Sequence, residues 1–103
     1  MAIAYNIDYA AIGRRFAEVV RPLPSVSGLW VQQVHDYVEL WLLTEPIDAQ
    51  QELDLYAASA WLHQAYPDVN IQFHLVNPLM FETGTAYVGD VIPRDAVEIP
   101  LRG

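Results

Sequence analysis

The chain contains no cysteine among its 103 residues, and this absence excludes several kinds of site. Disulfide bridges, thiolate metal centres and cysteine nucleophiles are all ruled out. Long hydrophobic runs are absent too, because no segment approaches the ~20 apolar residues that a membrane-spanning helix needs. The first eight residues lack the basic flank and apolar run of a secretion signal. We therefore expect a soluble, cytoplasmic protein.

Positive charge is scarce and unevenly distributed. The net charge is −8, and residues 25–82 contain no lysine or arginine. Phosphate backbones are bound by clustered cations, so this acidic stretch argues against a nucleic-acid partner. Such acidity is typical of a solubilising surface, and it also suits a basic protein partner or the arginine-bearing start of a second copy. The acids of this stretch are Asp36, Glu39, Glu45, Asp48, Glu52, Asp54, Asp68 and Glu82.

The usual motifs of enzyme chemistry are also missing. There is no Gly-x-Ser-x-Gly nucleophile elbow, and no serine has a positional link to a histidine and an acid. No glycine-rich phosphate-binding loop is present. The three histidines, His35, His63 and His74, lack the paired spacing of zinc sites. The sequence therefore predicts neither a metal nor a cofactor.

The length of the chain predicts a single domain over residues 1–103. Its core spans 8–78, and a C-terminal extension spans 79–103. Proline and glycine divide the extension, so we expect turns and short extended pieces there. The extension is expected to pack along its own domain or to exchange with a second copy.

The first part of the core predicts a helix followed by a hairpin. Asp8 can cap a helix that runs to about Val20 or Arg21, where prolines prevent its continuation. Alternating apolar residues then predict strands over 29–34 and 37–43. His35-Asp36 is the turn between them, since both residue types tolerate positive φ.

The second part of the core predicts a helix and a third strand. Asp48 and Gln51 form a capping box for a helix that ends before Pro67, and alternation over 69–76 predicts the strand. A strand-helix-strand crossover makes the second and third strands parallel. The fold class is therefore α+β: two layers, a small mixed sheet of three strands and both helices on one face. The predicted buried stripe of the second helix is Leu53, Tyr56, Ala57, Ala60 and Trp61.

Four polar residues are candidates for binding. His35, Asp36 and Glu39 lie at the tip of the predicted hairpin, where an imidazole and two carboxylates could bind a divalent cation. Asp36 and Glu39 differ by an odd number, so we expect their carboxylates not to converge. His74 lies on the polar face of the third strand, as a surface or interface histidine does.

Aromatic and basic residues are the candidates for an interface. Trp30 and Trp41 lie on the two hairpin strands, and Arg14 and Arg15 lie on the first helix. Large aromatics dominate both cores and interfaces, and an aromatic pocket formed with Trp61 is an alternative. A small domain with an exposed strand edge or an apolar patch has a reason to associate.

The stretch from Glu39-Leu40-Trp41-Leu42-Leu43-Thr44-Glu45-Pro46 to the strand ending at Asn77-Pro78 resembles minimal nucleotidyltransferase domains in its layout. The resemblance covers about residues 25–78. It implies two-metal nucleotidyl transfer where the family's acids are intact, and for minimal members a role as an antitoxin with a helical partner. Here Asp36-Tyr37-Val38-Glu39 replaces the alternating acids, and the third acid falls near Asn70 or Gln72. Neutral amides cannot replace carboxylates between two metal ions, so catalysis is expected to be absent.

The sequence as a whole favours a non-catalytic protein-interaction domain that forms a homodimer and takes a basic protein as a further partner. One alternative is a Mg²⁺-dependent nucleotide-binding or nucleotidyl-transfer enzyme that uses Asp36 and Glu39. Another is a small-molecule sensor with an aromatic pocket.

Overall fold

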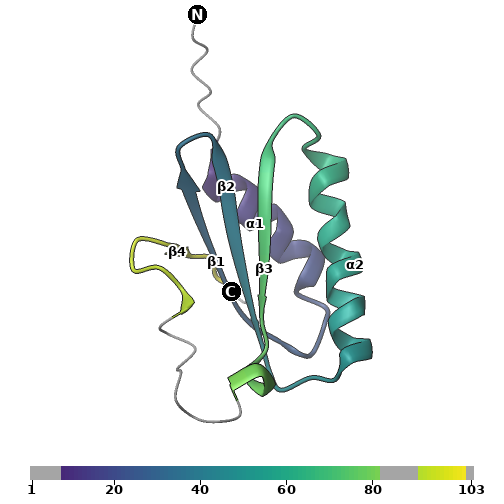
Figure 1. Ribbon diagram of the computed structural model, residues 1–103. Helices are drawn as coiled ribbons and strands as arrows, with labels where there is room; N and C mark the ends of the chain where they lie inside the picture. Colours follow the sequence, from purple (N-terminus) through teal and green to yellow (C-terminus); the bar gives the residue numbers. More distant parts are fainter. Residues whose placement is uncertain (1–7, 82–90, 102–103) are drawn as a thin grey trace, which may run out of the picture.

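The computed structural model describes residues 8–81 and 91–101, which form a two-layer α+β fold. Both helices cover one face of a mixed sheet, as the sequence predicts (Figure 1). The strands lie in the order β3-β2-β1-β4. Along the chain the elements are α1 (Tyr9–Val20), β1 (Val26–Val34), β2 (Tyr37–Thr44), α2 (Ala49–Ala65), β3 (Asn70–Val76), the 3₁₀ helix η1 (Pro78–Phe81) and β4 (Val97–Glu98).

The helix α1 begins and ends where the sequence predicts. The carboxylate of Asp8 accepts a hydrogen bond from the backbone N–H of Ala11 at 3.0 Å, which satisfies one of the free donors of the first turn. Ile12, Phe16 and Val20 lie at helical spacing and are buried against the sheet. This single apolar stripe is why α1 lies flat on the sheet.

The hairpin of β1 and β2 is antiparallel, and Trp30 pairs directly with Trp41. His35 has φ 54°, the positive value that the first central residue of a primed two-residue hairpin turn requires. The prediction of a His35-Asp36 turn is confirmed. Leu29, Val31 and Leu40 are fully buried on the helix side, so the alternate residues of both strands lie on the opposite face.

The capping box of α2 is formed as predicted, but the predicted buried stripe is wrong. Asp48 and Gln51 each accept a backbone hydrogen bond from the other, at 2.9 and 3.0 Å. The side chains that α2 buries are Leu55, Ser59 and Leu62, whereas Leu53 is 61% exposed. Apolar residues lie on every side of α2, so periodicity alone did not identify the face that meets the sheet. Tyr56, Ala57 and Ala60 are exposed as well, and Trp61 is half-buried.

The crossover from β2 through α2 makes β3 parallel to β2, as predicted, with a continuous register from Tyr37 opposite Asn70 to Leu43 opposite Val76. Asn77 closes this unit. It is 2% exposed, and its amide oxygen accepts hydrogen bonds from the N–H groups of Ile47 and Leu79. The amide nitrogen donates to the carbonyl of Ile47 and to the carboxylate of Glu52. One buried side chain therefore ties the end of β3 to the start of α2.

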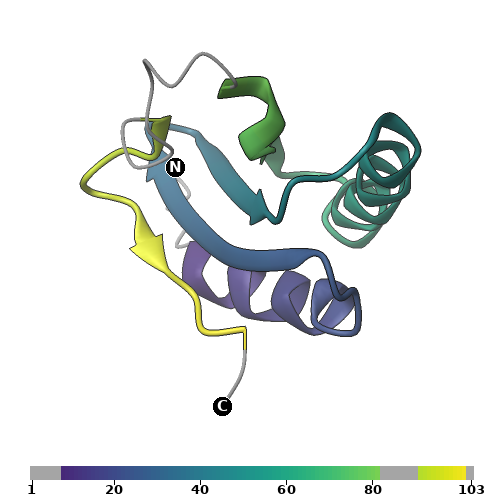
Figure 2. The same cartoon turned by 90° about the horizontal axis from the view of Figure 1, so that it is seen from below.

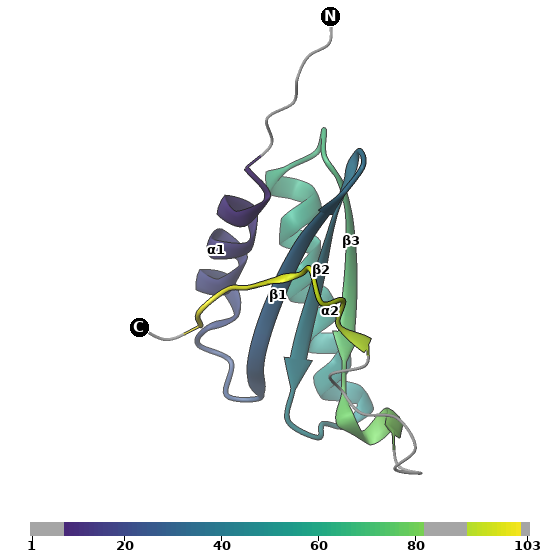
Figure 3. The same ribbon diagram turned by 90° about the vertical axis from the view of Figure 1, so that its left-hand side faces the viewer.

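The C-terminal extension adds a fourth strand to the three that the sequence predicts. β4 pairs antiparallel with β1, and the N–H of Ile99 donates to the carbonyl of Leu29 at 2.8 Å. Ile99 is 4% exposed and lies against Gly13 of α1. In Figure 3 this segment crosses the edge of β1 and ends beside α1, where Arg21 donates to the carbonyl of Leu101 at 2.7 Å. Residues 91–101 thus pack on their own domain.

Aromatic rings join the two helices to the sheet. Phe16 of α1 stacks on Trp61 of α2 with 6.5 Å between ring centroids, and meets Phe73 of β3 edge-to-face at 5.7 Å. These contacts make the helix layer and the sheet one core. Neither described helix combines the length and the apolar character needed to cross a bilayer.

Candidate functional site

The face of the sheet without helices carries half of the predicted site residues, namely Trp30, Trp41, Glu39 and His74. The register places Trp30, Trp41 and His74 in one row across β1, β2 and β3. The next row contains Gln32, Glu39 and Gln72. Residues in one row share a face of the sheet, so three distant segments contribute to a single polar and aromatic surface.

Glu39 and His74 are the predicted binding residues that the structure brings together. Nε2 of His74 lies 2.9 Å from a carboxylate oxygen of Glu39, and its ring stacks on Trp41 with centroids 5.1 Å apart. The Glu39 side chain is mostly buried, at 17% exposure, and that of His74 is 40% exposed. The imidazole is therefore fixed from two sides, and the contact joins the parallel strands β2 and β3. This pairing predicts a structural role for both groups.

His35 and Asp36 lie apart from that pair. Both are exposed at the hairpin turn, and the carbonyl of His35 accepts a hydrogen bond from the Gln33 side chain at 3.4 Å. Within residues 8–81 and 91–101, no three histidine, aspartate or glutamate side chains gather in a way that could hold a metal ion. The nucleotidyltransferase resemblance puts a third acid near Asn70 or Gln72, and of these Gln72 pairs with Glu39 whereas Asn70 pairs with Tyr37. As a neutral amide it adds no charge for a second metal.

The three tryptophans do not share one pocket. Trp30 and Trp41 lie on the face without helices, whereas Trp61 packs between the helices on Phe16. Trp41 is only 5% exposed, so it offers a partner little surface. The ring of Trp30 covers Gly28, where an added Cβ would come within 2.7 Å of the indole. Glycine at that position is what allows this close approach.

The two arginines predicted for an interface differ in their surroundings. Arg14 is exposed and lies 3.7 Å from the carboxylate of Asp8, a separation at which a surface pair contributes little. Arg15 donates to the hydroxyl of Tyr66 at 3.1 Å and lies over the rings of Tyr66 and Trp61, 5.6 and 5.4 Å from their centroids. Its guanidinium therefore packs on the aromatic rings of Trp61 and Tyr66.

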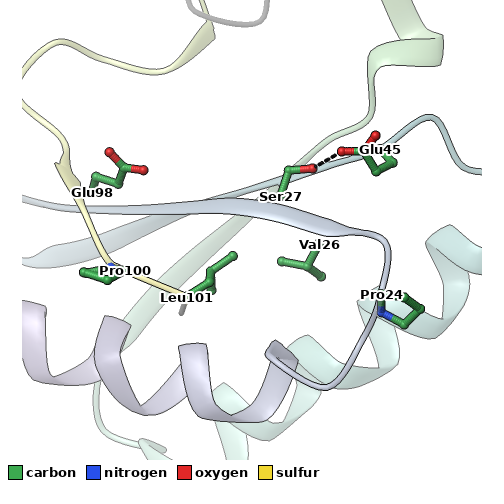
Figure 4. Close-up of a pocket in the computed structure, with 7 residues that line it drawn as sticks. All are labelled: Pro24, Val26, Ser27, Glu45, Glu98, Pro100 and Leu101. Atoms are coloured by element: carbon green, nitrogen blue, oxygen red, sulfur yellow. Dashed lines mark hydrogen bonds between the residues drawn. The ribbon is translucent and has the colours of Figure 1, made fainter. Parts of the chain in front are cut away.

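A cleft of about 530 Å³ between β1 and the C-terminal segment has a carboxylate at each end. Ser27 donates to Glu45 at 2.6 Å at one end, and Glu98 lies at the other (Figure 4). Sequence reasoning missed this cleft, because it depends on β4 pairing with β1 across more than 60 residues of sequence. The described residues that line this cleft include no basic side chain and no third acid, and two separate carboxylates do not define a chemistry.

Comparison of the chain with protein-family models, curated proteins and solved structures gave no match. The resemblance to nucleotidyltransferase domains therefore stays a prediction, and a function has to be inferred from the residues of this chain alone.

Proposed function

We propose that this protein is a non-catalytic interaction domain that works as a homodimer joined through α2. The observation that supports this proposal is the outer face of α2. Periodicity predicts Leu53 to be buried, yet within its own chain Leu53 is the most exposed of the large apolar residues for which exposure is described. A second copy is a surface against which the predicted stripe can be buried.

The outer stripe has the spacing of a helix-helix seam. Gln50, Leu53, Ala57, Ala60 and Gln64 alternate steps of three and four residues, the pattern of facing positions in coiled coils, and all five are exposed or half-buried. None of them is charged, although the protein carries a net charge of −8. Contact between two copies through these five residues therefore brings none of their charged groups into like-charge contact.

An antiparallel pair about a two-fold axis at Ala57 makes the stripe complementary to itself. Leu53 of each copy then packs on Ala60 of the other, and Gln50 lies opposite Gln64. Alanine at the centre allows the two helices to approach closely, within the 8–10 Å range of packed helices. A C₂ contact of this kind is isologous and closes at two subunits.

Size-exclusion chromatography with light scattering tests the dimer. We expect a dimer mass at protein concentrations from about 1 to about 100 µM, the range in which a micromolar dimer is populated. Leu53→Glu places a charge at the seam and should give a monomer. Val97→Glu, at an apolar residue that is 43% exposed on β4, is the matched control and should stay dimeric. A wild-type monomer throughout, or a dimeric Leu53→Glu variant, contradicts the proposal.

A further inference from the structure

The outer edge of β3 has no partner strand within residues 8–81 and 91–101. There β3 pairs with β2 only and ends the sheet. Natural sheets protect such edges with lysine, proline, bulges, inward-pointing charges or a covering helix or loop, because free N–H and C=O groups can pair with another strand. Here α2 lies beside the edge, and a groove remains between the two. The seven residues of β3, Asn-Ile-Gln-Phe-His-Leu-Val, contain no lysine, carboxylate or proline, and their register with β2 has no bulge.

A groove of about 380 Å³ runs along this edge. It is lined by four consecutive residues of β3, Phe73 to Val76, together with Trp41, Tyr56 and Val91. Consecutive strand residues point to opposite faces, so a groove that touches four in a row must pass along the edge of the strand. The free backbone groups of β3 therefore lie beside this groove.

The helix α2 provides the side of the groove. In Figures 1 and 2 it lies beyond β3, the last strand, so it reaches past the edge of the sheet. Tyr56 is 47% exposed and meets Phe73 edge-to-face with ring centroids 5.8 Å apart. Every second side chain of an additional strand beside β3 would therefore pack on Tyr56 and Phe73. Such a strand would gain apolar contacts as well as backbone hydrogen bonds.

Among the described residues, the charged side chains nearest to the β3 strand are carboxylates. Glu39 contacts His74, and Glu52 contacts Asn77 at the end of β3. No lysine or arginine is among the described residues that line the groove, and Arg94 lies three residues beyond its lining residue Val91. We propose that the β3 edge binds an extended, cationic peptide segment of another protein, which joins the sheet as an additional strand. The segment alternates apolar residues, which face α2, with lysine or arginine on the other side.

Main-chain hydrogen bonds supply affinity in this mode of recognition, and the alternate side chains supply specificity. The basic partner expected from the sequence would thus bind in this groove, in an extended backbone conformation.

Binding at this groove does not depend on the homodimer. The seam of Leu53, Ala57 and Ala60 faces away from the buried side of α2, whereas Tyr56 lines the groove.

Fluorescence anisotropy with three labelled seven-residue peptides tests the proposal on the full chain. The first alternates lysine and valine, the second has the same sequence with every second amide N-methylated, and the third alternates glutamate and valine. We expect micromolar binding of the first peptide and at least ten-fold weaker binding of the other two. Equal binding of the N-methylated peptide rules out strand addition, equal binding of the glutamate peptide rules out charge selection, and no binding at millimolar concentration rules out both.

Two single substitutions on the same helix separate this groove from the dimer seam. Tyr56→Ala should weaken binding of the lysine-valine peptide at least five-fold and leave the dimer intact. Leu53→Glu should abolish the dimer without weakening peptide binding. If the peptide instead converts the dimer to monomers while Leu53→Glu stays dimeric, a second copy occupies the β3 edge and the proposal is wrong.

Discussion

The two outer strands of the three-stranded core sheet differ in whether another described strand pairs with them: β4 pairs with β1, and none pairs with the outer side of β3. At the β1 edge a register shift lies between Val26 and Gly28, and β4 pairs with the strand farther along. Ile99 then inserts between this edge and α1. At the β3 edge the strand itself has no bulge, no lysine and no carboxylate, and no described strand pairs with its outer side.

This difference shows where the chain places its C-terminal segment. Residues 97–101 close one edge, and nothing comparable closes the other among the described residues. Since a free edge is a liability in a protein that has no use for it, the contrast favours a function for the β3 side. Substitutions at four positions test the contrast.

Truncating Ile99, which lies between the β1 edge and α1, should have the largest effect on stability. Ile99→Ala deletes a side chain that is 4% exposed, and we expect a loss of about 3 kcal/mol of unfolding free energy in urea denaturation. Val97→Ala, two residues earlier and 43% exposed, should change stability by less than about 0.5 kcal/mol. Similar losses for the two variants would mean that the segment does not close the edge.

Asn77→Ala should be the next largest change, and it acts on the β3 side. It leaves the buried backbone groups of Ile47 and the half-buried carboxylate of Glu52 without this partner, which should cost about 2 kcal/mol in thermal or urea unfolding. Asn70→Ala is the control, because Asn70 is exposed at the start of the same strand. An Asn77→Ala variant with unchanged unfolding free energy would show that other contacts hold α2 to β3.

Gly13→Ala should have a smaller effect, whose sign depends on Ile99. An added Cβ would lie 2.9 Å from Cγ1 of Ile99, so the helix-propensity gain of about 1 kcal/mol should be more than offset by crowding. In an Ile99→Ala background the same change should become neutral or stabilising. A double-mutant cycle in urea measures this coupling, and an additive result would place Ile99 away from α1.

Charge changes at Gln72 should have the smallest effect and should act on the β3 edge alone. Gln72 is exposed beside Glu39, so Gln72→Lys and Gln72→Glu should each keep stability within about 0.5 kcal/mol. Gln72→Lys should weaken binding of the lysine-valine peptide several-fold, and Gln72→Glu should strengthen it. Anisotropy titrations at low and high salt measure the peptide affinity of both variants. A change of affinity in the same direction for the two variants would exclude an electrostatic effect.

Local signals made most of the fold predictable. Asp8 and the Asp48-Gln51 box mark both helix starts, and the alternation around His35-Asp36 marks the hairpin. Such features depend on neighbours within a few residues, which is why sequence alone identifies them.

Features that depend on distant contacts were not predictable. The pairing of β4 with β1 joins Trp30 to Glu98, and the inner face of α2 was misassigned because its apolar residues surround the helix. For the candidate site, sequence placed Glu39 and His74 on separate strands, and only the parallel register brings them to 2.9 Å. Tyr56 was predicted to be buried, so its place beside the β3 groove was missed.

The most direct test of the contrast between the two edges is an NMR titration of ¹⁵N-labelled protein with the lysine-valine peptide. We expect the backbone amides of Phe73 to Val76, the amide of Tyr56 and the indole N–H of Trp41 to shift together. The amides of Leu29, Val31 and Ile99 should stay unchanged. Shifts confined to β1 and β4, or spread evenly over the acidic surface, would contradict a free β3 edge that binds a strand.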